Sequence, residues 1–246
     1  MITDYYRPEA LPEALELLKQ PDTLPLGGGT LLSTLKSASV KVVDLQALGL
    51  NTLQKKGNSL EIGATVNLQH LLESEHTPDA LKAALKLEAP LNIRNTATVA
   101  GALIAADGRS TFTTTMLALD AKLTIVNPKS EIITLGEFLP LRPDNLRGAL
   151  ITTIEIPLNT KLTFESVART PADKPIVCAA LASWPSGRTR LALGGYGAAP
   201  LLAMDGTESE GLEEAARNTF HEATDKWASA EYRMDVAATL AKRCQE

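Results

Sequence analysis

The hydrophobic pattern of the first 160 residues alternates between helical and extended periods. Apolar residues recur at helical spacing in Pro8–Leu18, and a proline near the first turn favours a helix start there. Short apolar or β-branched runs bounded by turn residues predict strands, and Thr65 or Asn67 is placed to cap a further helix. The expected helices are Pro8–Leu18, a helix through Leu68–Leu72, Pro78–Leu87 and Thr113–Asp120, and the expected strands are Thr23–Leu26, Lys41–Leu45, Thr52–Gln54, Leu60–Ile62, Lys122–Val126 and Glu131–Thr134.

The pattern of the last 100 residues predicts long strands followed by a helical tail. The turn Pro185-Ser186-Gly187 favours an antiparallel pair of strands. The tail Gly211–Arg243 is expected to be helical, with Trp227 and Tyr232 as anchors in the core. Pro157 and Asn159 mark a boundary, so we predict an α+β fold with two domains, residues 1–159 and 160–246. The expected strands are Arg147–Pro157 after its turn, Leu162–Arg169, Ile176–Trp184 and Thr189–Leu193.

A run of three glycines follows the strand expected at Thr23–Leu26. Pro25–Leu32 reads Pro-Leu-Gly-Gly-Gly-Thr-Leu-Leu. Consecutive glycines are costly to order, so a turn that contains them favours a role for bare backbone. Backbone N–H groups in such a turn can converge on a phosphate, and Thr30 can add a hydroxyl donor. A plain tight turn explains the same run equally well, because a lone glycine run is a weak motif.

Small residues are concentrated a second time, in Ile93–Leu103. Ala97, Ala100, Gly101 and Ala102 lie there, with Thr98 among them. Such residues let the backbone come close to another surface, although packing alone would also account for them.

Composition and charge narrow the classes of partner. The 246 residues have a net charge of −5 and a pI near 5.4, and no basic cluster is interleaved with aromatic residues. This argues against nucleic acid and an anionic membrane as partners. No apolar run approaches the length of a bilayer span, and the first residues lack a basic segment followed by an apolar one, so we expect a cytoplasmic protein.

The chain offers few residues for catalysis or metal binding of its own. Cys178 and Cys244 form neither a disulfide framework nor a metal site, and the histidines His70, His76 and His221 lack a completing ligand set. The glycine run has neither the lysine of a P-loop nor the third glycine of a Rossmann motif, and no nucleophile elbow occurs. We therefore expect no catalytic residue and no metal on this chain. Holding a cofactor that carries the reactivity is the better prediction.

Several motifs, taken in order, resemble the FAD-binding subunits of molybdenum hydroxylases, the group of the carbon monoxide dehydrogenase medium subunit and the xanthine dehydrogenase flavin domain. Each motif is weak alone, and the ordered set is specific. The matching segments are Leu26–Thr30, Glu61–Ala64, Ile93–Gly101, Leu117–Ala121, Leu150–Thr152, Ala168–Thr170, Pro175–Ala179, Ala192–Gly195 and Ala230–Arg233.

The resemblance implies a fold, a cofactor and partners. The fold would be a two-lobed α+β FAD-binding domain of the vanillyl-alcohol-oxidase-like (PCMH) type, followed by a small α+β domain. FAD would take electrons from a separate [2Fe-2S] subunit, fed by a molybdopterin-binding large subunit, and pass them to a soluble electron acceptor. The residues that the resemblance assigns to FAD binding are Leu26, Gly27, Gly28, Gly29 and Thr30 in the first loop, Thr98, Val99 and Gly101 in the second, and Thr111.

The chain departs from the family pattern in the second loop. Ala100 stands for a glycine, Ala102 for an asparagine and Ala105 for a polar residue, while Thr111 stands for an aspartate. Each lost side-chain hydrogen bond would weaken binding by roughly 0.5–1.5 kcal/mol. We expect FAD to bind mainly through backbone contacts. A flavin-free scaffold subunit of the same assembly and an unrelated small-molecule binding module remain as alternatives.

Overall fold

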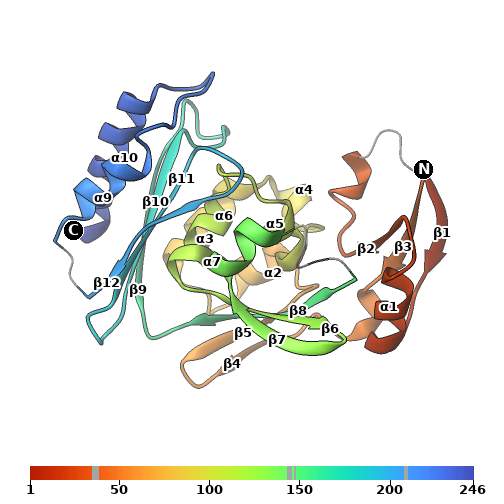
Figure 1. The fold of residues 1–246 in the computed structure, drawn as a ribbon. Coiled ribbons are helices and arrows are strands. Elements are labelled where there is room, and N and C mark those ends of the chain that lie inside the picture. Colours follow the sequence, from red (N-terminus) through yellow and green to blue (C-terminus); the bar gives the residue numbers. More distant parts are fainter. Residues whose placement is uncertain (35–38, 143–145, 147, 208–209) are drawn as a thin grey trace. The chain divides into compact units, whose positions relative to one another are not determined.

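The computed structural model describes residues 1–34, 39–142, 146, 148–207 and 210–246. They form an α+β fold whose chain divides into two compact units (Figure 1). Unit 1 comprises residues 1–74, 91–105 and 122–155, and unit 2 comprises residues 75–90, 106–121 and 156–246. The fold class predicted from the sequence is confirmed, whereas the predicted domain division at residue 159 stays a prediction.

The amino-terminal part of unit 1 is a three-stranded parallel sheet in the order β1-β3-β2. The helix α1 has a proline in its first turn. It buries Ala14, Leu15 and Leu18 in a cluster with Val43 of β3 and Leu45, the residue after β3. Because β2 pairs with β3 up to its last residue, the glycine run begins where the pairing stops. The elements are β1 (Ile2–Tyr6), α1 (Leu11–Leu18), β2 (Thr23–Leu26), η1 (Leu32–Thr34), β3 (Val40–Asp44) and η2 (Gln46–Leu48).

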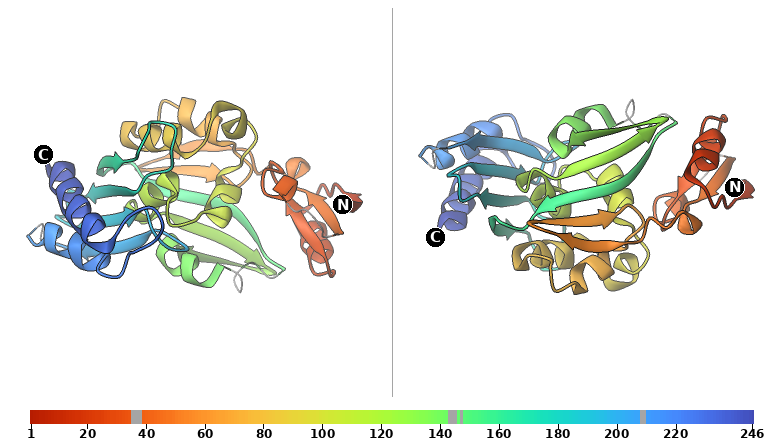
Figure 2. Two further views of the ribbon diagram at one scale, coloured as in Figure 1. Left: turned by 90° about the horizontal axis from the view of Figure 1, so that it is seen from above. Right: turned by 90° about the horizontal axis from the view of Figure 1, so that it is seen from below.

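The rest of unit 1 is built on a five-stranded sheet in the order β4-β5-β8-β6-β7, which Figure 2 shows from below. The predicted hairpins are confirmed as β4–β5 and β6–β7, both antiparallel. Asn67 caps α2, since its side chain accepts a hydrogen bond from His70 N. The elements are β4 (Leu53–Lys56), β5 (Ser59–Gly63), α2 (Leu68–Glu73), α4 (Leu91–Arg94), α5 (Val99–Ala105), β6 (Lys122–Asn127), β7 (Lys129–Thr134), α7 (Leu135–Phe138), η3 (Leu139–Leu141) and β8 (Leu150–Pro157).

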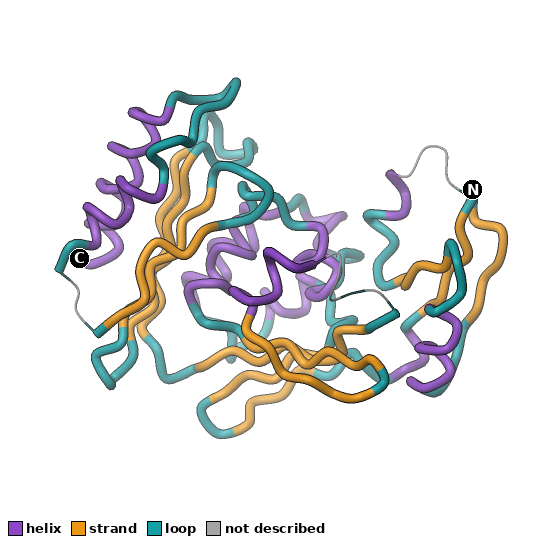
Figure 3. Tube along the Cα trace, in the orientation of Figure 1, coloured by secondary structure: helices purple, strands orange, loops and turns teal. Residues whose placement is uncertain are grey.

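Unit 2 is a four-stranded antiparallel sheet in the order β12-β11-β10-β9. Figure 3 shows helices beside both faces of this sheet, α9 and α10 on one side and α3 and α6 on the other. Val177–Ala182 of β10 are accordingly all buried. The elements are α3 (Asp79–Glu88), α6 (Thr111–Ala118), β9 (Lys161–Val167), β10 (Val177–Ser183), β11 (Thr189–Gly194), β12 (Leu201–Gly206), α9 (Leu212–Thr219) and α10 (Ala230–Gln245).

The observed elements differ from the predicted ones in three respects. The edge strands β1 and β12 were not predicted, because their side chains are largely exposed and do not alternate in polarity. The tail Gly211–Arg243 was predicted to be helical, and it is helical except for residues 220–229, which separate two helices. The predicted anchors were wrong: Tyr232 is 45% exposed and Trp227 is half-buried, while Phe220 and Leu240 fill the core.

Candidate functional site

The glycine run forms a tight turn between β2 and η1. The carbonyl oxygen of Leu26 still accepts from Leu45 N at 3.1 Å, and the carbonyl oxygen of Gly29 accepts from Ser33 N at 3.0 Å. Gly29 has a φ of +72°, in the left-handed region that favours glycine. The chain therefore bends at the glycines, and the bend needs Gly29 for its backbone conformation.

The turn lies directly against the second small-residue segment. A Cβ at Gly28 would be 1.6 Å from the carbonyl oxygen of Thr96, and a Cβ at Gly27 would be 2.9 Å from Thr98 Oγ1. A Cβ at Gly101 would be 2.8 Å from the same hydroxyl oxygen. The two segments are thus in contact through bare backbone, so glycine is required here by close approach.

Thr98 is held at this contact from several sides. It forms an isolated antiparallel bridge with Asn67, and the next residue, Val99, donates from its N–H to the Val66 carbonyl oxygen at 2.8 Å. Thr98 Oγ1 accepts from Gly101 N at 3.2 Å. The segment is therefore pinned to the chain around α2 and presents a fixed surface to the glycine turn.

Both segments line one cavity of about 420 Å³ that lies wholly in unit 1. This volume is in the usual range for small-molecule sites. Its described lining is aliphatic side chains, bare backbone and threonine hydroxyl groups, with no charged side chain. The lining residues are Leu18, Thr23, Leu24, Pro25, Gly27, Gly28, Gly29, Thr30, Leu31, Leu32, Leu45, Ala64, Thr65, Thr98, Ala100, Gly101, Ile104, Leu146, Gly148, Ala149, Leu150 and Ile151.

The glycine turn supplies this cavity with hydrogen-bond donors. Among the turn and loop hydrogen bonds of the described residues, none has the N–H of Gly28, Gly29 or Thr30 as its donor. None of these three residues is buried. Backbone donors beside a cavity whose described lining has no carboxylate suit an anionic ligand group, and the aliphatic walls suit an apolar ring system. These residues therefore fit a cofactor with a phosphate and an aromatic part.

The cavity brings together six of the nine residues predicted to bind the cofactor: Gly27, Gly28, Gly29, Thr30, Thr98 and Gly101. Leu26 and Val99 flank the lining residues but are not among them, and the Val99 side chain is fully buried.

Thr111 belongs to unit 2 and does not line the cavity. Its buried hydroxyl donates to the Ala84 carbonyl oxygen at 2.8 Å and lies 3.1 Å from Glu88 Oε2. Glu88 also accepts from Phe112 N at 2.9 Å, so this carboxylate caps the start of α6. The predicted role of Thr111 in binding stays a prediction.

Sequence reasoning missed two parts of the cavity wall. Ala64 and Thr65 follow β5, and Gly148–Ile151 lead into β8. The hydrogen bond from Ala64 N to the Thr152 carbonyl oxygen, 3.0 Å long, joins these two parts. Both lie at segments that match the family motifs, and that match was the signal that could have placed them at the site.

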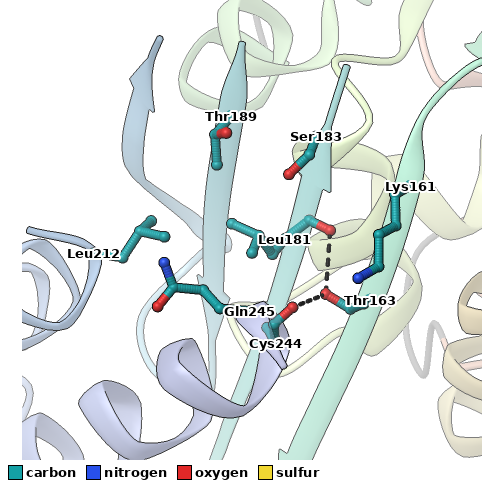
Figure 4. A pocket seen from close by; sticks show the side chains of 8 residues that line it. All are labelled: Lys161, Thr163, Leu181, Ser183, Thr189, Leu212, Cys244 and Gln245. Atoms are coloured by element: carbon teal, nitrogen blue, oxygen red, sulfur yellow. Dashed lines mark hydrogen bonds between the residues drawn. The ribbon is translucent and has the colours of Figure 1, made fainter. Parts of the chain in front are cut away.

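A second, smaller cavity lies in unit 2 and does not compete for this role. Its volume is about 170 Å³, and Figure 4 shows side chains from β9, β10, β11 and the end of α10 around it. The Thr163 hydroxyl there donates to the Cys244 carbonyl oxygen at 2.7 Å and lies 3.4 Å from that of Leu181. Its one hydroxyl hydrogen is thus already used within the protein.

The described residues hold no cluster of three or more His, Cys, Asp or Glu side chains that could bind a metal ion. Burial raises the pKa of the Cys178 thiol to about 12 and that of the Cys244 thiol to about 11. Both thiols are therefore protonated at neutral pH. No helix among the described residues is long and apolar enough to cross a membrane.

Comparison with known proteins gives the family. Residues 1–159 match the family described as "FAD binding domain in molybdopterin dehydrogenase". The glyceraldehyde dehydrogenase medium chain of Sulfolobus acidocaldarius is 29% identical over 82% of this chain and 78% of its own length. The uncharacterized protein YgfM of Escherichia coli is 29% identical over 98% of this chain and 94% of its own.

Solved structures share the fold. A chain of the CO dehydrogenase from Oligotropha carboxidovorans superposes with a TM-score of 0.84 at 24% identity, covering 98% of this chain and 96% of that one. A chain of the quinoline 2-oxidoreductase from Pseudomonas putida 86 superposes with a TM-score of 0.81 at 22% identity, covering 98% and 94%. With the family match and a cavity whose lining fits the cofactor, the chain belongs to the FAD-binding domain family of molybdopterin dehydrogenases, which makes it a flavoprotein component of an oxidoreductase with FAD as its cofactor.

Proposed function

We propose that the cavity of unit 1 binds FAD with its diphosphate at the glycine turn, and that this chain passes electrons from an iron–sulfur subunit to a soluble acceptor. The observation that supports this most directly is the contact between Gly28 and Thr96, where a Cβ would be 1.6 Å from a carbonyl oxygen. At this contact no side chain lies between the glycine turn and the segment around Thr98, and both segments line the same cavity. That arrangement is what a diphosphate, which needs close backbone donors, requires.

In this proposal the residues of the chain bind and orient the cofactor rather than react. The N–H groups of Gly28, Gly29 and Thr30 would hold the phosphate groups of the cofactor, and the Thr30 hydroxyl would add a further donor. The aliphatic lining residues exclude water from the ring system. Bound FAD supplies electron transfer through its ring. The described lining residues carry no charge, so none of them supplies an acid or base at this cavity.

The proposed partners are a [2Fe-2S] subunit and a molybdopterin-binding large subunit. The name of the archaeal relative, a dehydrogenase medium chain, supports an assembly of several chains. The two cysteines of this chain, Cys178 and Cys244, are both buried in unit 2, so an iron–sulfur cluster would have to be supplied by another subunit. We place this assembly and its soluble acceptor in the cytoplasm as part of the same proposal.

The flavin-free scaffold is the second candidate, and one observation favours it. Ala100 lines the cavity and Ala102 lies in the same helix, α5, so neither position offers the hydrogen-bonding side chain of the family pattern. Backbone donors at the glycine turn are unaffected by these replacements, which is why FAD binding remains our proposal.

Reconstitution with FAD separates the two candidates. The purified chain is mixed with excess FAD, freed of unbound flavin by gel filtration, and examined for a bound flavin absorption spectrum and quenched flavin fluorescence. Stoichiometric flavin that a Gly28→Ala variant fails to retain is the expected result. A chain that elutes without flavin, with circular dichroism showing that it is folded, contradicts the proposal and supports the scaffold.

The proposed partners need a separate test. The chain is purified from its native source under mild conditions, and the co-purifying subunits are analysed for iron, acid-labile sulfide and molybdenum. We expect all three in fixed ratio to flavin. A flavin-containing chain that purifies alone would leave FAD binding standing and contradict the proposed partners.

A further inference from the structure

Three loops of unit 2 place an unusual number of cations around one indole ring. The guanidinium carbons of Arg109 and Arg169 lie 4.8 and 4.6 Å from the centre of the Trp227 ring, and Lys226 Nζ lies 5.0 Å from it. Lys174 lies next to Pro175, whose carbonyl oxygen accepts from Arg109 Nε at 2.9 Å. We call Arg109, Arg169, Lys174, Lys226 and Trp227 the Trp227 patch.

The Trp227 patch carries an excess of positive charge. Its carboxylates are Asp107, which pairs with Lys174 at 2.8 Å, and Asp173, which lies 3.7 Å from Arg169 Nε. Among the ion pairs of the described residues, none includes Arg109 or Lys226. A third carboxylate, Asp225, is paired with the buried Arg233 at 2.8 Å. Apart from this pair, four cations face two carboxylates on the surface of a chain whose net charge is −5. A local excess of this sign on an acidic protein favours an acidic partner.

The loop that carries Arg109 is fixed by backbone contacts. Gly108 N donates to the Gly197 carbonyl oxygen at 2.9 Å, and Gly195 N donates to the Gly108 carbonyl oxygen at 2.6 Å. A Cβ at Gly108 would lie 1.8 Å from the Tyr196 carbonyl oxygen, so the two loops touch with no room for a side chain. Arg109 also donates to the Lys174 carbonyl oxygen, which joins its loop to the segment after Asp173.

The loop that carries Trp227 is fixed by an ion pair between Asp225 and the buried Arg233. Arg233 is fully buried and donates to Asp225 Oδ1 at 2.8 Å and to the Ala228 carbonyl oxygen at 2.9 Å. Asp225 Oδ1 in turn accepts from Trp227 N at 2.7 Å. Side chains held in place before binding lose less entropy on binding.

The composition of the patch is that of a binding surface between proteins. Arginine and tryptophan are the residue types that most often dominate the binding energy of such interfaces. Neither of the two cavities described above includes a residue of the patch. We propose that the Trp227 patch is the docking surface for an acidic face of another protein. This surface is separate from the FAD cavity and does not depend on it.

The test combines charge reversal with the fluorescence of Trp227 itself. Trp184 and Trp227 are the only tryptophans, so Trp184→Phe leaves Trp227 as the single reporter. In this background Arg169→Glu with Lys226→Glu reverses two exposed cations of the patch, and Lys242→Glu with Arg243→Glu at the exposed end of α10 makes the same change in net charge elsewhere. Poly-L-glutamate is the probe at low salt.

We expect a saturable change in Trp227 emission with poly-L-glutamate that is lost at high salt. The patch variant should bind at least about tenfold more weakly than the parent, and the α10 variant should bind like the parent. Flavin binding and circular dichroism, measured on the same samples, should be unchanged in both variants. Equal weakening in the two variants, or no change in emission, overturns the proposal.

Three further probes exclude other occupants. A 20-base-pair DNA or phosphatidylserine vesicles that bind more tightly than poly-L-glutamate, with the same dependence on the patch variant, would make the surface a nucleic-acid or membrane site and overturn the proposal. A dimer of the parent chain, seen in sedimentation and abolished in the patch variant, would also overturn the proposal, because the occupant would then be a second copy.

The assembly itself gives a last test. In an assembly purified with its other subunits, the patch variant should dissociate at lower salt than the α10 variant, and equal dissociation counts against the proposal.

Discussion

Replacing Gly28 by alanine tests whether backbone contact shapes the proposed cofactor cavity. The new Cβ would be 1.6 Å from the Thr96 carbonyl oxygen, whereas Cβ atoms in proteins essentially never approach a heavy atom within 3.0 Å. The two backbones must therefore part by about 1.4 Å, the difference between these two distances. Neither side of the contact is a flexible side chain, so the strain has no easy release, and overpacking of this kind costs typically 1–3 kcal/mol.

Part of this strain should appear as lost stability and part as lost cofactor affinity. A loss of about 1.4 kcal/mol corresponds to a tenfold weaker binding constant. If all the strain fell on binding, the affinity would drop about a hundredfold, so we expect Gly28→Ala to bind FAD more weakly than the parent by up to about that factor. Urea unfolding measures the first quantity, and titration of flavin fluorescence measures the second. Gly206→Ala is the matched control, because its Cβ would have no neighbour within 4 Å. It should leave both quantities within about 0.5 kcal/mol of the parent.

An unchanged FAD affinity in a folded Gly28→Ala protein would refute this reasoning. If Gly28→Ala fails to fold, Gly27→Ala keeps the test decisive. Its Cβ would be 2.9 Å from Thr98 Oγ1, the end of a side chain that can rotate away. We then expect a smaller loss of stability and a measurable loss of affinity. Parent-like binding by Gly27→Ala would contradict the proposed site.

Three other predictions concern unit 2. Thr111→Val should lower the free energy of unfolding by about 1 kcal/mol, because the hydrogen bonds of the hydroxyl are lost, and should leave FAD affinity unchanged. A weaker FAD affinity with unchanged stability would instead support the binding role predicted for Thr111. Burial raises the pKa of Asp225, but hydrogen bonds from Arg233 and two backbone N–H groups lower it overall, so its contribution to stability should be present at neutral pH and lost as the pH falls through the acidic range below about 4. In Asp225→Asn, the free energy of unfolding by urea should therefore depend less on pH over that range. An equally steep loss of stability with falling pH in the variant would refute the assignment. With pKa values of about 12 and 11, Cys178 and Cys244 should resist iodoacetamide at pH 8 in the native protein and react after unfolding, as mass spectrometry can show.

Local patterns predicted the elements wherever burial is one-sided or a turn is explicit. The strand Thr23–Leu26 was predicted with its observed bounds, and both hairpins of unit 1 follow clear turn signals. The break in the carboxyl-terminal helix was missed because it depends on tertiary contacts. Arg233, a residue with good helix propensity, is fully buried, and its side chain binds carbonyl oxygens of the loop before it. No local pattern marks an arginine as a buried anchor.

The sequence drew attention to the glycines that line the cavity and not to most of its other walls. A run of three glycines is rare enough to draw notice, but its partner segment is separated from it by about seventy residues, and only the folded chain brings Thr96 to Gly28. Thr111 was assigned by counting along a family motif, and counting cannot show that its hydroxyl is engaged with Ala84. Long-range contacts therefore decided which predicted residues meet.

The alanines of the second loop are consistent with the same steric rule that governs the glycines. Gly101 remains glycine, where a Cβ would be 2.8 Å from Thr98 Oγ1, whereas Ala100 accommodates its Cβ at a buried position of the cavity wall. The chain thus keeps bare backbone where a side chain would collide, and it departs from the family pattern where a small side chain fits. Such a pattern preserves the shape of the cavity while removing polar side chains from it. It follows that FAD binding should depend more on the backbone donors of the glycine turn than on α5. We therefore expect Ala102→Asn to change FAD affinity less than Gly28→Ala does. A larger effect of Ala102→Asn in the same titration would contradict a site built mainly from backbone.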